Sequence, residues 1–113
     1  MAATSPNHTI PRTAKAAVLS DVKGAYIIKD DHPVKQPSEL KPGECLIKLE
    51  YSGVCHSDLH VKKGDWSRPP ILPLVGGHEG VGRIVAIGEN SRAGPVKIGD
   101  RVGIKWIGEV CTQ

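Results

Sequence analysis

The stretch CLIKLEYSGVCHSDLH, residues 45–60, contains the change from strand to loop to helix that decides the fold. Apolar and polar side chains alternate over Cys45–Ser52, which is typical of a half-buried strand. Ile47, Leu49 and Tyr51 are therefore expected on one face, and the intervening charged side chains on the opposite, solvated face.

The second half of this stretch predicts the one helix that we expect in the chain. The helix is placed at Ser57–Lys63, with Ser57 as its N-cap and Asp58 in its first turn, where a carboxylate favours the positive end of the helix dipole. Two lysines lie in its last turn, and Gly64 is expected to end it. The predicted helix is short, at about two turns.

The rest of the chain predicts a mainly β domain over residues 14–113. Thirteen glycines and nine prolines separate short runs rich in valine and isoleucine, a pattern of strands joined by tight turns. Residues 1–13 are polar, contain two prolines and are expected to form a flexible N-terminal arm. Further strands are predicted at Ala14–Leu19, Tyr26–Lys29, Val81–Ile87 and Arg101–Trp106.

Composition excludes several classes of protein. Of the 113 residues 39% are hydrophobic and 24% charged, which indicates a globular chain with one modest core. The formal charge of +3 is spread along the chain and aromatic residues make up only 4%, so no nucleic-acid partner is expected. No apolar run reaches the roughly 18 residues of a membrane span, and the first residues lack the apolar region of a signal peptide. We therefore expect a cytoplasmic protein without a membrane partner.

Two segments concentrate reactive side chains: GVCHSDLH at residues 53–60 and GGHEGVG at residues 76–82. The three cysteines form no C-x-x-C pair, so a disulfide scaffold is not expected. A Cys55 thiolate and a His78 imidazole are a common zinc-ligand pair, and at 23 positions apart they must meet through the fold. On these residues alone, a buried cysteine and a hydrogen-bonded loop histidine remain the commoner interpretation.

A second histidine pair lies within the predicted helix. His56 and His60 are four residues apart, so one helical face would carry both, as in the H-E-x-x-H motif of zinc proteases. That motif needs a glutamate directly after the first histidine, and Ser57 stands there instead. The protease interpretation therefore fails, and the pair could simply cap or solvate the helix.

The order and spacing of three motifs resemble one known family. These motifs are CHSDLH at residues 55–60, GDW at residues 64–66 and LVGGHEGVG at residues 74–82. Together they resemble the amino-terminal part of zinc-dependent medium-chain alcohol dehydrogenases, in particular the yeast and fungal type, over about Lys15 to Cys111. The resemblance implies a GroES-like fold, a distorted barrel of strands with one or two short helices, here incomplete.

The resemblance also implies a catalytic zinc site. Cys55 and His78 match two of the three protein ligands of the zinc ion, whose fourth position takes water or alcohol. Glu79 matches an acidic neighbour that can approach the metal from behind, although a surface salt bridge is an equally open interpretation. Asp58 matches a residue that orients a histidine ligand.

Roles in proton transfer and binding follow from the same resemblance. Ser57 matches the hydroxyl that receives the alcohol proton, and His60 matches the end of a proton relay to solvent. His56 matches the residue that meets the pyrophosphate of NAD. Trp66 matches a wall of the pocket for a small alcohol, with plain core packing as its alternative role.

Several parts of such an enzyme are not found in the sequence. The third zinc ligand is a cysteine further downstream in the family, and no G-x-G-x-x-G fingerprint of a Rossmann domain occurs. Cys111 matches the first of four cysteines that hold a structural zinc, so this site is incomplete. We therefore expect the amino-terminal segment of a homo-oligomeric enzyme that oxidises a primary alcohol to an aldehyde with zinc and NAD, and expect this chain alone to be inactive.

Two alternatives remain at this stage. The chain could be a non-catalytic GroES-like module that binds zinc or another protein. It could also resemble the zinc-free quinone reductases, but that branch is not expected to keep Cys55 together with His78.

Overall fold

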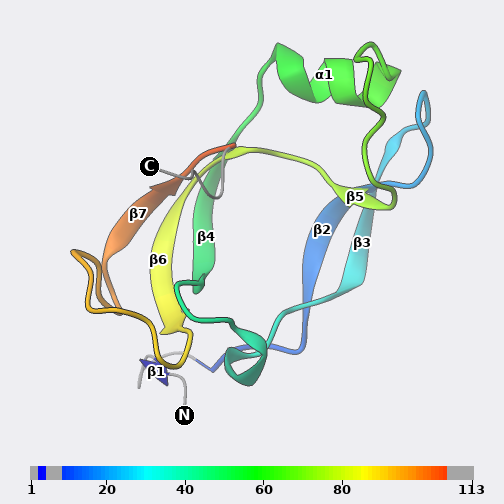
Figure 1. The fold of residues 1–113 in the computed structure, drawn as a ribbon. Coiled ribbons are helices and arrows are strands. Elements are labelled where there is room, and N and C mark those ends of the chain that lie inside the picture. The colour runs from blue at the N-terminus through cyan, green and yellow to red at the C-terminus, as the bar shows by residue number, and fades with distance from the viewer. Residues whose placement is uncertain (1–2, 5–8, 107–113) are drawn as a thin grey trace.

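The computed structural model describes residues 3–4 and 9–106, and shows two antiparallel sheets with one short α-helix beside them (Figure 1). A 3-10 helix, η1, spans Pro37–Glu39. The other elements, in chain order, are β1 (Ala3–Thr4), β2 (Thr13–Leu19), β3 (Tyr26–Pro33), β4 (Cys45–Gly53), α1 (His56–Lys63), β5 (Leu74–Val75), β6 (Glu79–Ile87) and β7 (Arg101–Ile104).

The larger sheet has four strands and is organised around β6. Strand β4 pairs with β6 along its length, from Cys45 opposite Ile87 to Gly53 opposite Glu79. The other edge of β6 pairs with β7 near its beginning and with β1 near its end. Two residues of the predicted N-terminal arm, Ala3–Thr4, therefore belong to this sheet.

The smaller sheet has three strands in the order β3-β2-β5. Strands β2 and β3 form a hairpin in which Leu19 lies opposite Tyr26. The two residues of β5 pair with the end of β2, where Leu74 lies opposite Leu19. The smaller sheet therefore reaches the segment that leads from α1 to β6.

The buried apolar side chains come from both sheets. Val18 and Leu19 are buried on β2, Leu40 follows η1, and three consecutive residues are buried on β6, namely Ile84, Val85 and Ala86. Neighbouring side chains on a strand point to opposite faces, so this part of β6 is covered on both sides. The core therefore lies toward the end of β6 that is far from Glu79.

The mainly β fold with a short helix is confirmed, and its sheets are open. Each predicted strand is present, but β3 extends to Pro33, β6 begins at Glu79, and β7 ends at Ile104 instead of Trp106. The two-residue strand β5 was not predicted, because the prolines around it indicate a loop. No helix in the described part of the chain is long and apolar enough to cross a membrane.

The predicted N-cap of the helix is wrong. Helix α1 begins at His56, and its N-cap is Cys55 in an extended conformation instead of Ser57. The Asp58 carboxylate accepts a hydrogen bond from the Cys55 backbone N–H at 3.1 Å, which holds the first turn two residues earlier than expected. The predicted end is confirmed, because Gly64 adopts a left-handed conformation with φ +70°.

The predicted burial on β4 is also wrong in part. Leu49 and Tyr51 are 51% and 71% exposed, so the described residues do not cover the apolar face at this end of the strand. The β4–β6 register shifts between Leu46 and Ile47 and again between Leu49 and Tyr51. Such irregularities interrupt the strict alternation from which the face was predicted.

Candidate metal centre

The pairing of β4 with β6 brings the two reactive segments together. Gly53 ends β4 directly opposite Glu79, which begins β6, so the chain enters α1 beside the loop that carries His78. A Cβ atom on Gly53 would lie 3.1 Å from the Glu79 Cβ atom, which is a tight contact, and Gly77 has φ +98°. Glycine at these positions permits the close approach and the sharp turn.

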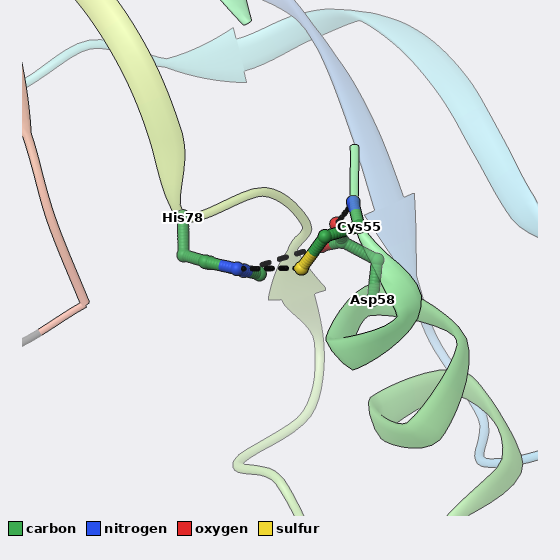
Figure 2. Close-up of side chains that lie close together, drawn as sticks. All are labelled: Cys55, Asp58 and His78. Atoms are coloured by element: carbon green, nitrogen blue, oxygen red, sulfur yellow. Dashed lines mark hydrogen bonds and ion pairs between the residues drawn. The ribbon is translucent and has the colours of Figure 1, made fainter. Parts of the chain in front are cut away.

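Cys55 and His78 face each other across this junction, as Figure 2 shows. The Cys55 Sγ atom lies 3.1 Å from the His78 Nε2 atom. Two such ligands on one tetrahedral zinc ion would be about 3.5 Å apart, given Zn–S and Zn–N distances of ~2.3 and ~2.0 Å. A small outward shift of the two side chains is therefore enough to admit the metal.

Two carboxylates flank the His78 ring on different sides. The Asp58 Oδ1 atom lies 3.6 Å from Nδ1, while the Glu79 Oε1 atom lies 3.7 Å from Nε2 (Figure 2 draws Asp58). The metal-binding atoms of Cys55, Asp58 and His78 lie within 4.8 Å of one another. Because Glu79 is on the side of the thiol, it can add a third donor, whereas Asp58 is placed to orient the ring from behind.

The donor chemistry of this junction fits zinc. A thiolate, an imidazole and a carboxylate oxygen are the ligand types that zinc takes in proteins. The His78 side chain is 19% exposed and that of Asp58 15%, so an ion would be partly screened from water. The residues that the structure describes at this junction therefore fit a zinc ion.

The other predicted histidines form a separate chain of contacts on α1. His56 Nδ1 lies 2.8 Å from His60 Nε2, and His60 Nδ1 lies 2.9 Å from Asp65 Oδ2. The His60 ring also stacks on Trp66, with ring centroids 6.3 Å apart. Asp65 was not singled out from the sequence, because its role appears only once Gly64 has turned the chain back toward His60.

A cleft of about 500 Å³ adjoins the metal centre. Its polar lining includes Asp58, His60 and His78, and Trp66 and Trp106 form part of its apolar wall. The ring centroids of Trp66 and Trp106 are 5.3 Å apart, and those of Trp106 and His78 are 4.7 Å apart. The remaining lining residues are Tyr26, Val61, Gly64, Arg68, Pro70, Ile71, Leu74, Val75, Gly76, Gly77, Ile104 and Lys105.

The predicted site residues divide into two groups by their relation to this cleft. Asp58, His60, Trp66 and His78 line it. Four others do not contribute to its wall, namely Cys55, His56, Ser57 and Glu79, although Cys55 and Glu79 contact His78. Cys111 and the predicted structural zinc site lie outside the described residues.

Sequence reasoning missed Tyr26 and Trp106 as parts of this region. Tyr26 begins β3, and its hydroxyl is buried without a hydrogen-bond partner among the described residues. Burial, and secondly the nearby Asp58 carboxylate, raise the pKa of Tyr26 above its ordinary value of 10.0. Gly76 leaves room for this ring, because a Cβ there would lie 2.5 Å from the Tyr26 Cε1 atom. Only the packing of β3 against this loop shows the contact.

Comparison with known proteins agrees with this geometry. The sequence model of the family described as the alcohol dehydrogenase GroES-like domain matches residues 41–113. An alcohol dehydrogenase of Geobacillus stearothermophilus is 47% identical over 99 residues, which are 88% of this chain and 27% of that protein. A crystal structure of an alcohol dehydrogenase-like protein from Sinorhizobium meliloti 1021 matches with a TM-score of 0.69 and 31% identity, over 85% of this chain and 30% of the other.

The fold and the site thus define a GroES-like domain of the alcohol dehydrogenase type. The chain belongs to the alcohol dehydrogenase GroES-like domain family. It spans about 27% of the length of the curated relative that it matches. The yeast and fungal subgroup stays a prediction.

Proposed function

We propose that this chain supplies the zinc-binding part of an alcohol dehydrogenase that oxidises a small primary alcohol to an aldehyde with NAD. The observation that carries this proposal is the 3.1 Å contact between Cys55 Sγ and His78 Nε2 beside a cleft. The family to which the chain belongs supports the same activity.

Cys55 and His78 would hold the zinc ion, with Glu79 as the nearest further donor on the same side of the His78 ring. When bound, zinc supplies Lewis acidity toward the alcohol oxygen, and NAD accepts the hydride. Asp58 takes a positioning role, because its Oδ2 atom caps α1 while its Oδ1 atom faces His78 Nδ1. The Asp58 carboxylate thus contacts both the N-terminus of α1 and the His78 ring.

The proton of the alcohol would leave through Ser57 and His60. The Ser57 hydroxyl can accept and donate a proton, and Ser57 lies on α1 next to Asp58, which lines the cleft, although Ser57 itself does not. His60 Nδ1 lies 2.9 Å from Asp65 Oδ2 and His60 Nε2 lies 2.8 Å from His56 Nδ1, so a proton that reaches His60 could pass along these contacts toward solvent. His56, exposed at the beginning of α1, would meet a cofactor phosphate.

The cleft beside His78 suits a small alcohol. Trp66, Ile71 and Trp106 give it an apolar wall, and its polar groups gather at Asp58, His60 and His78. An alcohol bound there would place its chain against the aromatic rings and its hydroxyl toward the metal centre. The dinucleotide-binding domain and the assembly into a homo-oligomer would belong to the rest of the protein.

Cobalt titration tests the metal site directly. A Co²⁺–thiolate contact produces a charge-transfer absorption band in the near ultraviolet, so we expect the purified chain to develop this band. Cys55→Ser should abolish it, whereas Cys45→Ser and Cys111→Ser should keep it. Binding should be weaker than at a complete Cys₂His site, because this chain offers two or three donors instead of the full set. An unchanged band in Cys55→Ser would overturn the proposal.

A further inference from the structure

We propose that His56 and His60 form a second metal site, separate from the Cys55–His78 centre, for a divalent transition-metal ion such as nickel(II) or copper(II). The two histidines are four residues apart on α1, and their rings face each other with centroids 4.4 Å apart. This site shares no donor atom with the pair Cys55 and His78.

Asp65 prepares one of the two nitrogens. The Asp65 carboxylate accepts a hydrogen bond from His60 Nδ1, at 2.9 Å, so the neutral His60 ring carries its proton on Nδ1. The lone pair of His60 is therefore on Nε2, the atom that faces His56. A carboxylate that accepts a hydrogen bond from the other ring nitrogen fixes the tautomer of a histidine ligand and raises the basicity of the ligating nitrogen. Histidines that bind metal ions in proteins usually have such a partner.

His56 supplies the other nitrogen. Its Nδ1 atom lies 2.8 Å from His60 Nε2 and donates the proton of that contact when both rings are neutral. Because the His56 side chain is exposed, water can move this proton to Nε2 and free the Nδ1 lone pair. The two nitrogens face each other across 2.8 Å, so a rotation of the two rings would turn both lone pairs toward a shared ion.

The spacing of the two nitrogens selects the geometry of the ion. With metal–nitrogen distances of ~2.0–2.1 Å, a separation of 2.8 Å corresponds to an angle of about 84–89° at the ion. Square-planar and octahedral ions place neighbouring ligands at this angle, whereas a tetrahedral ion such as zinc would need the two nitrogens about 3.3–3.4 Å apart, an outward shift similar to the one that Cys55 and His78 need. Imidazole suits nickel, copper and zinc alike, so any preference for nickel or copper rests on the spacing of the two nitrogens.

Access to this site is open. The His60 side chain is 38% exposed and that of Asp65 45%, so an ion can arrive with its remaining water ligands. Binding would occupy His60 Nε2, an atom of the residue that ends the proposed proton relay. If the proposed function holds, the same ion would therefore block this relay without taking a donor atom of the Cys55–His78 centre.

Nickel binding by the purified chain tests this proposal, with Ni²⁺ as the probe because it does not oxidise thiols. The titration uses a Cys55→Ser background, which removes the thiolate of the first centre, and follows the heat of binding. We expect one Ni²⁺ ion per chain, at least about tenfold weaker binding in His56→Ala and in His60→Ala, and a loss of about 10–100-fold in Asp65→Asn. His32→Ala, which removes a histidine on β3, is the matched control and should bind as before.

Each result decides the proposal. No nickel binding in the Cys55→Ser background, or equal affinity in His56→Ala and His60→Ala, would overturn it. Circular dichroism checks that each variant folds. If His60→Ala fails to fold, His56→Ala still tests the proposal, because the His56 side chain is exposed and its loss should not disturb the fold. The cobalt test of the first centre depends on Cys55, which is absent from this background, so failure of one proposal is distinguishable from failure of the other.

Discussion

The two ends of the β4–β6 pair differ in what their side chains do. At one end Ile84 and Ala86 are buried, with exposures of 2% and 0%, and their partners on β4 are half-buried. At the other end β6 carries Gly80 and Gly82, and Leu49 on β4 is exposed. The pair thus has a buried core end and a site end, next to the loop that carries His78, where glycines let β4 and β7 approach β6 closely. Stability and chemistry are separated along the same two strands.

The largest expected effect comes from breaking the core end. Ile84→Ala removes a buried side chain from the middle of the larger sheet and should lower the free energy of unfolding by about 2–5 kcal/mol, since a cavity remains. Urea denaturation followed by circular dichroism measures this loss. Val81→Ala, on the same strand toward the site end, is the matched control and should cost less than about 1 kcal/mol because the side chain is already exposed. Equal losses in the two variants would contradict the division of the strand.

The next effect comes from filling the site end. Gly82→Ala would place a Cβ atom 2.2 Å from the Lys48 backbone oxygen, so β4 and β6 must move apart. We expect a loss of about 1–3 kcal/mol in urea denaturation, together with weaker cobalt binding at Cys55 and His78. Gly103→Ala on β7 is the control, because a Cβ there meets nothing closer than the Gly80 oxygen at 3.9 Å. A Gly82→Ala chain as stable as this control would show that the ladder tolerates side chains here.

The local part of this difference could be predicted from the sequence. Alternation marks β4, the valine and isoleucine run marks β6, and Gly64 marks the end of α1, because each signal acts within a few residues. The pairing of Cys55 with His78 was predicted through a family resemblance, since no local signal joins two segments 23 positions apart. The contact that supports it arises from the register that sets Gly53 opposite Glu79.

Other parts of the site depend on packing that no single segment encodes. Tyr26 reaches the cleft from the smaller sheet, and Trp106 reaches it from the residues after β7. The exposure of Leu49 likewise depends on which element covers β4, and alternation alone cannot supply that information. The roles of Ser57, His56 and Glu79 stay predictions, because their chemistry requires a metal ion, a cofactor and a substrate.

A smaller effect should come from the junction between the site end and α1. Asp58→Ala removes the carboxylate that accepts the Cys55 N–H bond and faces His78, so it should lower the free energy of unfolding by about 1 kcal/mol. The same change should weaken cobalt binding about 10–100-fold, since the orienting group behind the histidine is lost. Asp31→Ala, at an exposed position on β3, controls for the loss of one negative charge. Unchanged cobalt affinity in Asp58→Ala would leave this residue with a capping role alone.

The smallest expected effect is a dependence of stability on pH, which comes from Glu50 at the site end of the pair. Glu50 on β4 accepts hydrogen bonds from Arg101 on β7 and Arg83 on β6, and the Arg101 bond, more than any other contact, lowers the pKa of Glu50 below its ordinary value of 4.5. Between the lower pKa of Glu50 in the folded chain and its ordinary pKa, the unfolded chain binds more protons than the folded chain. The stabilisation that Glu50 contributes is therefore fully present above pH ~4.5 and is lost as the pH falls through the pKa of the folded state.

Thermal unfolding between pH 7 and pH 3 measures this contribution. At pH 7 the wild-type chain should melt at a higher temperature than Glu50→Gln. This difference in melting temperature should become smaller as the pH falls and should vanish near pH 3. The difference should be small and should shrink at high salt, because the side chains of Arg83 and Arg101 are exposed and that of Glu50 is still 26% exposed to solvent. Asp31→Asn is the control for a carboxylate that does not face these arginines. A constant difference between wild type and Glu50→Gln from pH 7 to pH 3 would mean that the two arginines hold the strands together without the charge of Glu50.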